Sequence, residues 1–581
     1  MNGRRQTADG GRQRADGRRR TADGGLHRCD AVVRRAALLA LLLPSAVSRL
    51  PSQSTRAERS KYTETSTHTD VLSFIDSLQA KGAPIVVGSI GTTTQGRDLP
   101  FVIASRPLVH SPAEARRLGR PIVYVQGNIH AGEVEGKEAL QALLRDLVLS
   151  PKKNVLDSIV LIAVPIYNAD GNEVFGPTAR QRGSQNGPEL VGQRPNAKML
   201  DLNRDYVKAE APETRASLAM FNAWDPDLFV DLHTTNGSYH GYALTYAPSL
   251  HPAAGLRGAT FGGAFVRDSM LPAVRQRVRA RHHYEIFDYG NFTGDEGPAA
   301  PGEAKAWSTY DHRARYGVNY YALRGRLAVL SEAYSHDPFE RRVTSTYAFV
   351  SELLSLTAEK SRRVRALTRG ADAALGAGKV AEVPVRATLT KTPLLLPVIE
   401  ELLEKTDAPS AETGVRRGYR RTGKFVTNLL PVRDRFDATR TAPMPWGWLV
   451  TPAAADTVGA MLRLHGVRVL RTSAPTAAAG VECFVADSVV ASSRAFQGHR
   501  ETRFEGRWVP SAADVPSGAL IVTSRQPLGV LAQLLLDPNS DDGFGTWNFY
   551  DAAVARPAAA GGGVPVCRLT KAPAVPARLL P

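Results

Sequence analysis

A histidine and a glutamate three residues apart are the first residues in this chain that could carry chemistry. His130 and Glu133 lie in the stretch "QGNIHAGEVEGK", between the apolar run "PIVYV" and the helical pattern "EALQALLRDLV". A second histidine, His233, ends the strand pattern "LFVDLH". Two imidazoles and one carboxylate, with a fourth position open to water, form a ligand set of catalytic zinc sites. The three residues therefore indicate a zinc site.

The same turn is rich in glycine, which favours a metal site over a structural histidine. A histidine that follows a strand is more often a hydrogen-bonded part of the structure than a ligand. Here the turn contains Gly127, Gly132 and Gly136. Glycines let the backbone turn tightly and approach a ligand, which a helix cap does not require. Glu135 is expected to lie outside the metal shell. The histidines without such a setting, expected at the surface or the rim, are His240, His282 and His283.

Two further polar clusters could bind and activate a substrate. Asn203 and Arg204 are adjacent in "DLNRDY". The planar guanidinium fork suits a carboxylate and the amide adds a donor, although a surface ion pair with Asp201 or Asp205 is an equally open interpretation. Glu332 ends the apolar strand pattern "AVLSEAY". Burial opposes the charge of a carboxylate, so catalysis is the favoured explanation for its place there.

The elements that must position these clusters alternate between strands and helices. The pattern predicts a helix in "THTDVLSFIDSLQAKG", a hairpin in "IVVGSIGTTTQGRDLPFVIAS" and a helix in "APETRASLAMFNAW". A final strand, "GRLAVLSEAY", precedes one long amphipathic helix, "RRVTSTYAFVSELLSLTAEKSRRVRAL". Continuous apolar strands separated by helices predict an α/β sheet with a substantial parallel part. Ligands bind at the carboxyl ends of such strands, where we expect all four clusters.

Length and complexity predict two domains and a leader. The catalytic domain is predicted over 60–370, a low-complexity linker over 371–385 and an accessory domain over 386–581. In the last of these, "GWLVT", "AADTVGAMLRLHG" and "VRVLRT" form a strand-helix-strand pattern. A smaller α+β or β-rich domain without a catalytic cluster is therefore expected.

The N-terminal region resembles a leader followed by a secretory signal. Residues 1–33 repeat Arg, Gly and Ala-Asp-Gly, and are predicted to be disordered or not translated. Residues 34–48 combine a basic pair, the apolar run "AALLALLLP" and the small residues "SAVS", the pattern of a signal peptide. This run is too short for a stable membrane span. A buried core helix is the alternative, but export to the periplasm or the medium is predicted.

Charge and cysteine content exclude some functions. The net charge is +17, of which residues 1–48 carry +6 through ten arginines and four aspartates. The remaining charge is spread, with no basic stripe interleaved with aromatic residues, so nucleic-acid binding is not expected. Three cysteines cannot form a disulfide scaffold. Cys29 lies in the leader, while Cys483 and Cys567 could pair in an oxidising compartment, which their spacing does not decide.

The clusters occur in the order His-x-x-Glu, Asn-Arg, His, Glu, and in this the chain resembles the zinc carboxypeptidases of the carboxypeptidase A type. Supporting landmarks are "GRDLP", "PIYNADGNEVF", "LNRDY", "DLHTT" and "LSEAY". The resemblance covers roughly residues 62–367. It differs from the usual pattern in "ADG" where the family has "PDG". The fold that the resemblance implies is a mixed, largely parallel eight-stranded sheet flanked by helices, followed here by the smaller accessory domain.

The resemblance also implies a role for each site residue. One Zn²⁺ per chain would be held by His130, Glu133 and His233. The substrate's terminal carboxylate would be clamped by Asn203 and Arg204, with Tyr310 as a further substrate-binding residue. Glu332 would be the general base. Arg194 would stabilise the oxyanion, with Arg180 and Arg182 as rivals for that role.

The implied function is zinc-dependent removal of C-terminal residues from peptides or proteins by a metal-activated water. Two alternatives stay open. One is an amidase, a deacylase or a peptidase for cell-wall peptides within the same superfamily. The other is a non-catalytic protein that binds peptides or glycans. The sequence indicates neither the preferred terminal side chain nor the oligomeric state.

Overall fold

The computed structural model describes residues 53–256, 261–295, 302–407, 414–555 and 563–580. The predicted leader and signal peptide lie outside the described residues. Residues 53–581 form one compact unit. The division into a catalytic and an accessory domain therefore stays a prediction.

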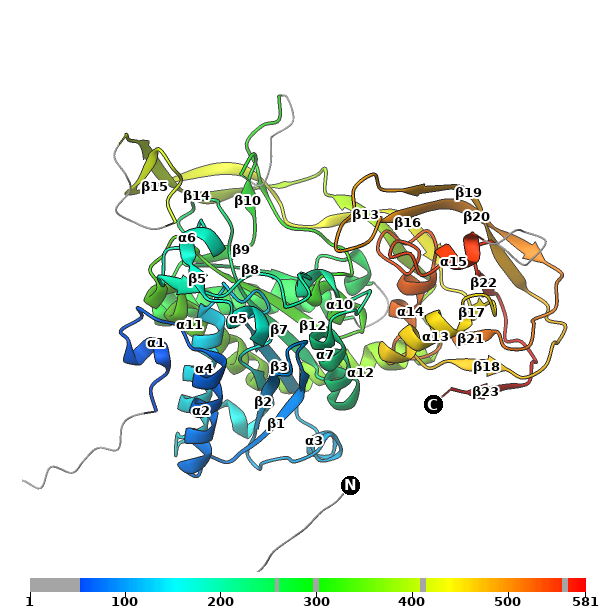
Figure 1. Ribbon diagram of the computed structural model, residues 1–581, viewed down its shortest axis with the longest axis horizontal. Coiled ribbons are helices and arrows are strands. Elements are labelled where there is room, and N and C mark those ends of the chain that lie inside the picture. The colour runs from blue at the N-terminus through cyan, green and yellow to red at the C-terminus, as the bar shows by residue number, and fades with distance from the viewer. Residues whose placement is uncertain (1–52, 257–260, 296–301, 408–413, 556–562, 581) are drawn as a thin grey trace, which may run out of the picture. The chain divides into compact units, whose positions relative to one another are not determined.

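A mixed sheet of eight strands forms the centre of the N-terminal part (Figure 1), in the order β1-β2-β4-β3-β7-β12-β8-β9. Its strands are β1 (Ile85–Thr92), β2 (Asp98–Ala104), β3 (Ile122–Gly127), β4 (Val160–Val164), β7 (Leu228–Thr234), β8 (Leu244–Pro248), β9 (Ile286–Asp288) and β12 (Leu327–Ala333). The pairs β3/β4, β3/β7, β7/β12 and β8/β9 are parallel, and the other three are antiparallel. The predicted mixed, largely parallel sheet is confirmed.

The first predicted elements form where their local signals lie. Helix α2 (His68–Ala80) begins after Thr67, whose hydroxyl accepts from the Asp70 N–H while the Asp70 carboxylate accepts from the Thr67 N–H. Strands β1 and β2 form the predicted antiparallel hairpin. Two landmark stretches meet beside it, because Arg97 of "GRDLP" donates to Asp170 of "NADG" at 2.7 Å. An ion pair thus holds the "ADG" turn against the hairpin at the edge of the sheet.

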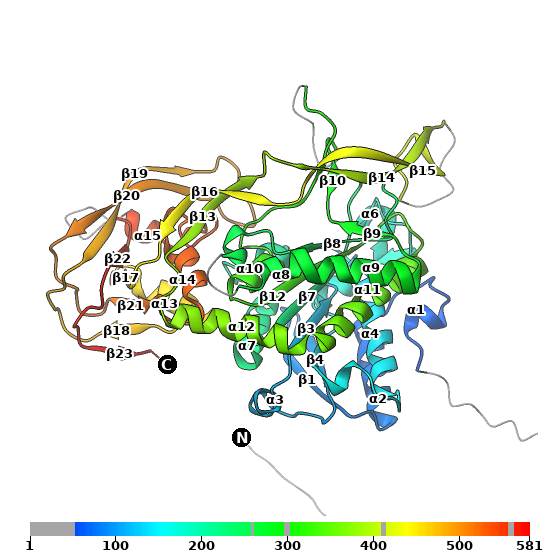
Figure 2. The ribbon, with the colours of Figure 1, turned by 180° about the vertical axis from the view of Figure 1, so that it is seen from behind.

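Helices cover both faces of the sheet (Figures 1 and 2). The principal ones are α2, α4 (Glu135–Val148), α7 (Pro212–Trp224), α9 (Leu271–His282), α10 (Gly317–Leu323), α11 (Phe339–Glu359) and α12 (Ser361–Gly376). Successive strand residues point to opposite faces. In β3, Val123 and Val125 pack in the cluster that holds α2, α4, α9 and α11, whereas Tyr124 packs in the cluster that holds α7 and α10. The sheet is therefore buried on both sides, as its continuous apolar runs predict.

The predicted single long helix is wrong in one respect, because it is broken at Lys360. Lys360 has φ −98° and ψ 19°, and it separates α11 from α12. Neither glycine nor proline marks this position, so the sequence gives no signal for the break. Helix α12 then runs on to Gly376, since Val364, Leu367, Ala371 and Leu375 recur at helical spacing and are buried. Residues 371–376 of the predicted linker are therefore helical.

The C-terminal part is β-rich, as expected. Strands β13 (Glu382–Leu389) and β16 (Phe436–Pro443) form a two-stranded sheet. Strands β14 (Leu394–Lys405) and β15 (Tyr419–Arg433) form a four-stranded sheet with β10 (Asn291–Phe292) and β11 (Trp307–Ser308), in the order β10-β11-β15-β14. The seven-stranded sheet contains β17 (Gly447–Val450), β18 (Leu470–Thr472), β19 (Val481–Ala491), β20 (Thr502–Ser511), β21 (Leu520–Thr523), β22 (Val566–Leu569) and β23 (Ala577–Leu579). Helices α13 (Ala455–Leu464) and α14 (Gly529–Leu536) accompany it. Cys483 and Cys567 face each other on β19 and β22 and form a disulfide.

The C-terminal part shares its core with the N-terminal part. One apolar cluster contains Phe229 of β7 and Tyr321 of α10 together with Trp448 and Leu520 of the C-terminal sheet. Polar contacts add to it, since the Tyr320 hydroxyl and His465 Nδ1 lie 2.7 Å apart. In the described part of the chain, no helix has the length and apolar character needed to cross a membrane.

Candidate active site

Three neighbouring parallel strands carry polar side chains to one edge of the sheet. His130 and Glu133 lie in the turn after β3, His233 lies near the end of β7, and Glu332 lies opposite His233 near the end of β12. Three of the four clusters therefore lie at carboxyl ends of strands, as predicted. The prediction was wrong for the cluster "DLNRDY", which forms the 3-10 helix η2 (Leu202–Arg204).

The turn between β3 and α4 is closely packed. Asn128 has φ 66°, in the left-handed region that asparagine tolerates, and its side-chain amide donates to the Ala131 carbonyl at 3.1 Å. A Cβ atom on Gly136 would lie 2.6 Å from Leu232 Cβ. A larger residue there would push α4 away from β7. The glycine thus holds Glu133 close to the histidine of the neighbouring strand.

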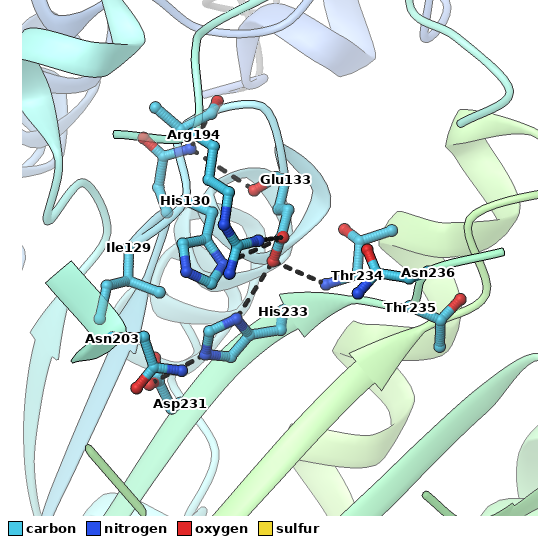
Figure 3. A network of polar contacts seen from close by, with 12 residues as sticks. Ile129, His130, Glu133, Arg194, Asn203, Asp231, His233, Thr234, Thr235 and Asn236 are labelled. Carbon is cyan, nitrogen blue, oxygen red and sulfur yellow. Dashed lines mark hydrogen bonds and ion pairs between the residues drawn. The ribbon is translucent and has the colours of Figure 1, made fainter. Parts of the chain in front are cut away.

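Glu133 lies between the two imidazoles (Figure 3). Its Oε1 is 3.0 Å from His130 Nδ1, and its Oε2 is 3.1 Å from His233 Nδ1. One ligand atom from each of the three residues lies within 4.8 Å of the others. Two nitrogen donors and a carboxylate converging in this way fit a zinc ion by the chemistry of the donor set.

The far sides of both imidazoles are held by carboxylates. His130 Nε2 lies 3.0 Å from Asp201 Oδ1, and His233 Nε2 lies 3.0 Å from Asp231 Oδ2. Carboxylates in this position fix the ring orientation of a metal-binding histidine. They leave the Nδ1 atoms facing the centre of the cluster. Asp201 and Asp231 each stand two residues before a predicted site residue. The sequence suggested Asp201 only as an ion-pair partner of Arg204, and it suggested no role for Asp231.

Two arginines share the Glu133 carboxylate. Arg182 and Arg194 donate to its Oε1 at 3.0 and 3.3 Å. Burial opposes ionisation of Glu133, but His130 and Arg182 hold its pKa well below the usual range. Arg182 is buried and also donates to the carbonyls of Thr234 and Thr235. Arg194 is one-third exposed and faces the cleft.

The third arginine considered from the sequence, Arg180, is exposed and does not line the cleft.

Glu133 and Glu135, the two carboxylates of the turn after β3, have different surroundings. Glu135 lies outside the metal cluster, as expected, but it is fully buried and paired with Arg342 at 3.3 Å. His240 was expected at the surface or the rim. It is instead 1% exposed, with its ring 4.2 Å from that of Tyr334.

A cleft of about 530 Å³ brings the predicted residues together. Its lining contains all eight: His130, Glu133, Arg194, Asn203, Arg204, His233, Tyr310 and Glu332. They come from a turn, a 3-10 helix, two strands and two loops of the chain. Their convergence is the main geometric result for the site.

Neighbouring groups hold the Asn203 and Arg204 pair in place. Asn203 Oδ1 accepts from the Gly317 N–H at 2.9 Å, which leaves its amide N–H groups free to act as donors. The Arg204 guanidinium lies 4.1 Å from the Tyr316 ring centroid, a cation–π contact. Arg204 also lies 3.9 Å from Asp201, whereas Asp205 pairs with Lys208. Tyr316 was not found from the sequence.

Glu332 and Tyr310 carry polar groups for which the described residues provide no hydrogen-bond partner. Among the described residues, no hydrogen bond or ion pair holds the Glu332 carboxylate. Its enclosure by protein raises its pKa to about 8, an effect that His233 opposes and Glu133 increases. The Tyr310 hydroxyl is buried without a hydrogen-bond partner. Both side chains line the cleft.

The family profile described as zinc carboxypeptidase matches residues 71–326. Carboxypeptidase 2 of Trichophyton equinum is 23% identical over 498 residues, which cover 82% of this chain and 81% of that protein. Carboxypeptidase Z of Mus musculus is 35% identical over 125 residues, which cover 20% of this chain and 17% of that protein. A solved metallo-carboxypeptidase from Pseudomonas aeruginosa covers 51% of this chain and 68% of its own, at 20% identity and a TM-score of 0.34.

This chain matches the zinc carboxypeptidase family over residues 71–326, and the relatives described above carry carboxypeptidase names. It is a zinc metallocarboxypeptidase, a hydrolase whose family acts on the C-termini of peptides and uses one zinc ion. The profile ends at residue 326, so Glu332 and the whole C-terminal part lie beyond the matched segment.

Proposed function

We propose that the protein removes single residues from the C-termini of peptides, with His130, Glu133 and His233 as its zinc ligands. The observation that carries this proposal is the convergence of the eight predicted residues on one cleft. A zinc ion held there would polarise the scissile carbonyl and lower the pKa of a bound water to roughly 7. The rest of the mechanism follows from the side chains of the chain itself.

Glu332 is the proposed general base and later the proton donor. Its carboxylate is in the cleft, opposite His233 on the neighbouring strand, and no other side chain occupies its oxygens. It would accept the proton of the attacking water and deliver it to the departing amine. Its raised pKa favours holding that proton between the two steps.

Arg194 is the proposed partner of the developing oxyanion. It faces the cleft and donates to Asp201 through Nε at 3.1 Å, which orients its guanidinium. A preoriented cation loses little by reorganisation when negative charge develops beside it. Arg182 is unsuited to this role because it is buried against Glu133 and two backbone carbonyls and does not line the cleft.

Asn203 and Arg204 are the proposed clamp for the terminal carboxylate. Each is fixed by a neighbour, Asn203 by the Gly317 N–H and Arg204 by the Tyr316 ring, so both present donors to the cleft with little freedom left to lose. Fixing the carboxylate would place the last peptide bond at the reacting groups. The unpartnered hydroxyl of Tyr310 can donate to the substrate backbone.

Two peptides of one sequence, one with a free and one with an amidated C-terminus, test the function. We expect mass spectrometry to show stepwise loss of single residues from the free peptide only. A chelator should stop the loss and added zinc should restore it. Equal cleavage of both peptides would contradict the carboxylate clamp and favour an amidase. No cleavage by a zinc-loaded protein that still binds the peptide would favour a binding function.

Export is part of the proposal. The signal-peptide pattern in residues 34–48 supports it, as does the disulfide between Cys483 and Cys567, because disulfides persist in oxidising compartments. Cell fractionation of the native host tests it: we expect the protein outside the cytoplasm, starting after residue 48. A cytoplasmic protein that retains residues 34–48 would contradict export.

A further inference from the structure

One wall of the cleft comes from beyond the segment that the family profile matches. Four residues of the β13/β16 sheet line it: Ala387, Thr388, Leu389 and Phe436. Leu389 and Phe436 are partners in the antiparallel register of these strands. The outer wall is therefore an apolar pair on a rigid two-stranded element.

Phe436 is in contact with the segment that also positions the carboxylate clamp. Its ring lies 4.5 Å from that of His312. His312 lies between Tyr310 and Tyr316 in the chain, and all three line the cleft. The Tyr316 ring supports Arg204. The side chain of a clamped terminal residue leaves the carbon next to the carboxylate, so it must lie near this segment.

His312 is held in place by the C-terminal part. Its Nε2 lies 2.9 Å from Asp541 Oδ2. Asp541 is fixed in turn, since its N–H donates to the Val385 carbonyl and its carboxylate accepts from the Ala387 N–H. His312 is only 6% exposed, and its Nδ1 makes no hydrogen bond, although Asp311 lies 3.4 Å away. The strand that supplies the wall thus also orients the histidine.

The charges near this wall are already paired. Arg313 donates to Asp311 at 2.6 Å, and Glu501 lies 3.7 Å from the same guanidinium. The apolar and aromatic side chains that line the cleft include Leu330, Leu389, Phe436 and Tyr289. A charged side chain entering here would lose its hydration without gaining a free partner. An apolar side chain would gain contact with two rings and two leucines.

We propose that Phe436, together with the His312 ring packed against it, forms the wall against the substrate's terminal side chain and selects bulky apolar residues. This inference rests on the proposed carboxypeptidase activity and names its substrate class. It makes the C-terminal part a component of the substrate site. Phe436 acts on specificity alone and takes no part in the chemical step.

Two substitutions of Phe436 test the assignment on matched peptides that end in Phe, Leu, Ala or Lys. Phe436→Ala removes the wall, and we expect kcat/KM for the Phe peptide to fall about tenfold, mostly through KM. Phe436→Trp fills the pocket, and we expect the same peptide to lose a similar factor. The Ala peptide should change by less than about twofold in both variants. Phe425→Ala is the control, because Phe425 is an exposed phenylalanine of β15 that does not line the cleft.

The outcomes separate this inference from the proposed function. A wild-type protein that prefers Phe and Leu, with the preference reduced in both Phe436 variants, supports the inference. Unchanged preferences, or equal losses on the Phe and Ala peptides, overturn it while leaving the carboxypeptidase activity in place. A zinc-loaded wild type that cleaves none of the four peptides overturns the proposed function and the inference with it. Circular dichroism and thermal melting show whether each variant is folded.

Discussion

Two buried polar clusters in this molecule differ in how completely they are paired. The first lies where the C-terminal part meets the central domain, and we call it the junction: Arg315, Glu501, Asp542 and Trp547. Arg315 donates to Asp542 through its backbone and two guanidinium nitrogens and to Glu501 through the third. The second is the cleft, where the Tyr310 hydroxyl and His312 Nδ1 are buried without a hydrogen-bond partner. The Glu332 carboxylate also lines this cleft, and no hydrogen bond or ion pair holds it among the described residues.

This difference distinguishes polar groups that stabilise the fold from polar groups that serve the activity. A buried polar group without a partner costs about 1–3 kcal/mol. The junction avoids this cost, because Asp542 accepts from Arg315 and from the indole of Trp547. The cleft retains it at several atoms. Such a cost is expected where a substrate or a metal supplies the missing partner, so the junction should govern stability and the cleft should govern activity.

Replacing Glu332 with glutamine is expected to have the largest effect on activity. The amide cannot accept the proton, so kcat should fall by about 1000-fold, within the usual contribution of a general base. Zinc content and melting temperature should stay near the wild-type values, since nothing in the fold depends on the Glu332 carboxylate. Steady-state kinetics, metal analysis and melting measure the three quantities. A zinc-loaded variant with full activity would remove Glu332 from the mechanism.

Arg182 and Arg194, which both donate to Glu133, test more sharply the contrast between groups that govern stability and groups that govern activity. Arg194→Gln should lower kcat by about 100-fold with little change in stability, as expected for loss of one oxyanion partner. Arg182→Gln should instead lower the melting temperature and zinc content, because Arg182 is buried against Glu133 and two carbonyls. The reverse pattern would exchange the two roles.

Breaking the junction should affect stability first. Asp542→Asn leaves Arg315 buried with one carboxylate fewer, and loss of one partner from a buried ion pair costs about 3–5 kcal/mol. Urea unfolding measures the change. Below the unfolding transition, kcat should remain within about threefold of wild type. An unchanged unfolding midpoint would show that the junction does not hold the two parts together.

Acid sensitivity is the smallest expected effect and again involves the contact between the two parts. Burial lowers the pKa of His465 to about 3, whereas an unfolded histidine has a pKa of about 6.5. Between these values the unfolded chain binds a proton that the folded chain does not. Stability is therefore complete above about pH 6.5 and falls as the pH falls, by about 2 kcal/mol at pH 5.

His465→Gln removes this titrating group, so the slope of stability against pH between 5 and 6.5 should decrease. Urea unfolding at several pH values measures the slope. His251 is also buried with its pKa lowered to about 3, so the remaining slope should not vanish. A slope equal to that of the wild type would contradict a buried neutral His465.

The fold was predictable where apolar periodicity and caps act locally. The strands and the α2 cap carry their own signals, and the strand-end histidines follow from them. The break at Lys360 has no local signal. The helical extension to Gly376 does have one, in the spacing of Leu367, Ala371 and Leu375, but the glycine-rich and alanine-rich composition of that stretch obscured it.

The sequence predicted which residues meet in the cleft, but it predicted their contacts incompletely. His130, Glu133 and His233 are brought together because β3 and β7 are neighbours in the sheet. The alternation of elements predicts a parallel sheet but not this strand order. The cation–π support of Arg204 by Tyr316 and the wall at Phe436 depend on packing between segments far apart in sequence. Such contacts depend on tertiary structure, so no residue spacing in the sequence predicts them.

The zinc content of purified protein tests the central claim most directly. We expect one zinc ion per chain in the wild type after reconstitution and dialysis, and less than about one tenth of that in His233→Ala. His282→Ala, which changes a partly exposed histidine paired with Glu352 outside the cleft, should retain the full amount. Wild-type protein without zinc, or a His233→Ala variant with one zinc per chain, would contradict the assigned metal site.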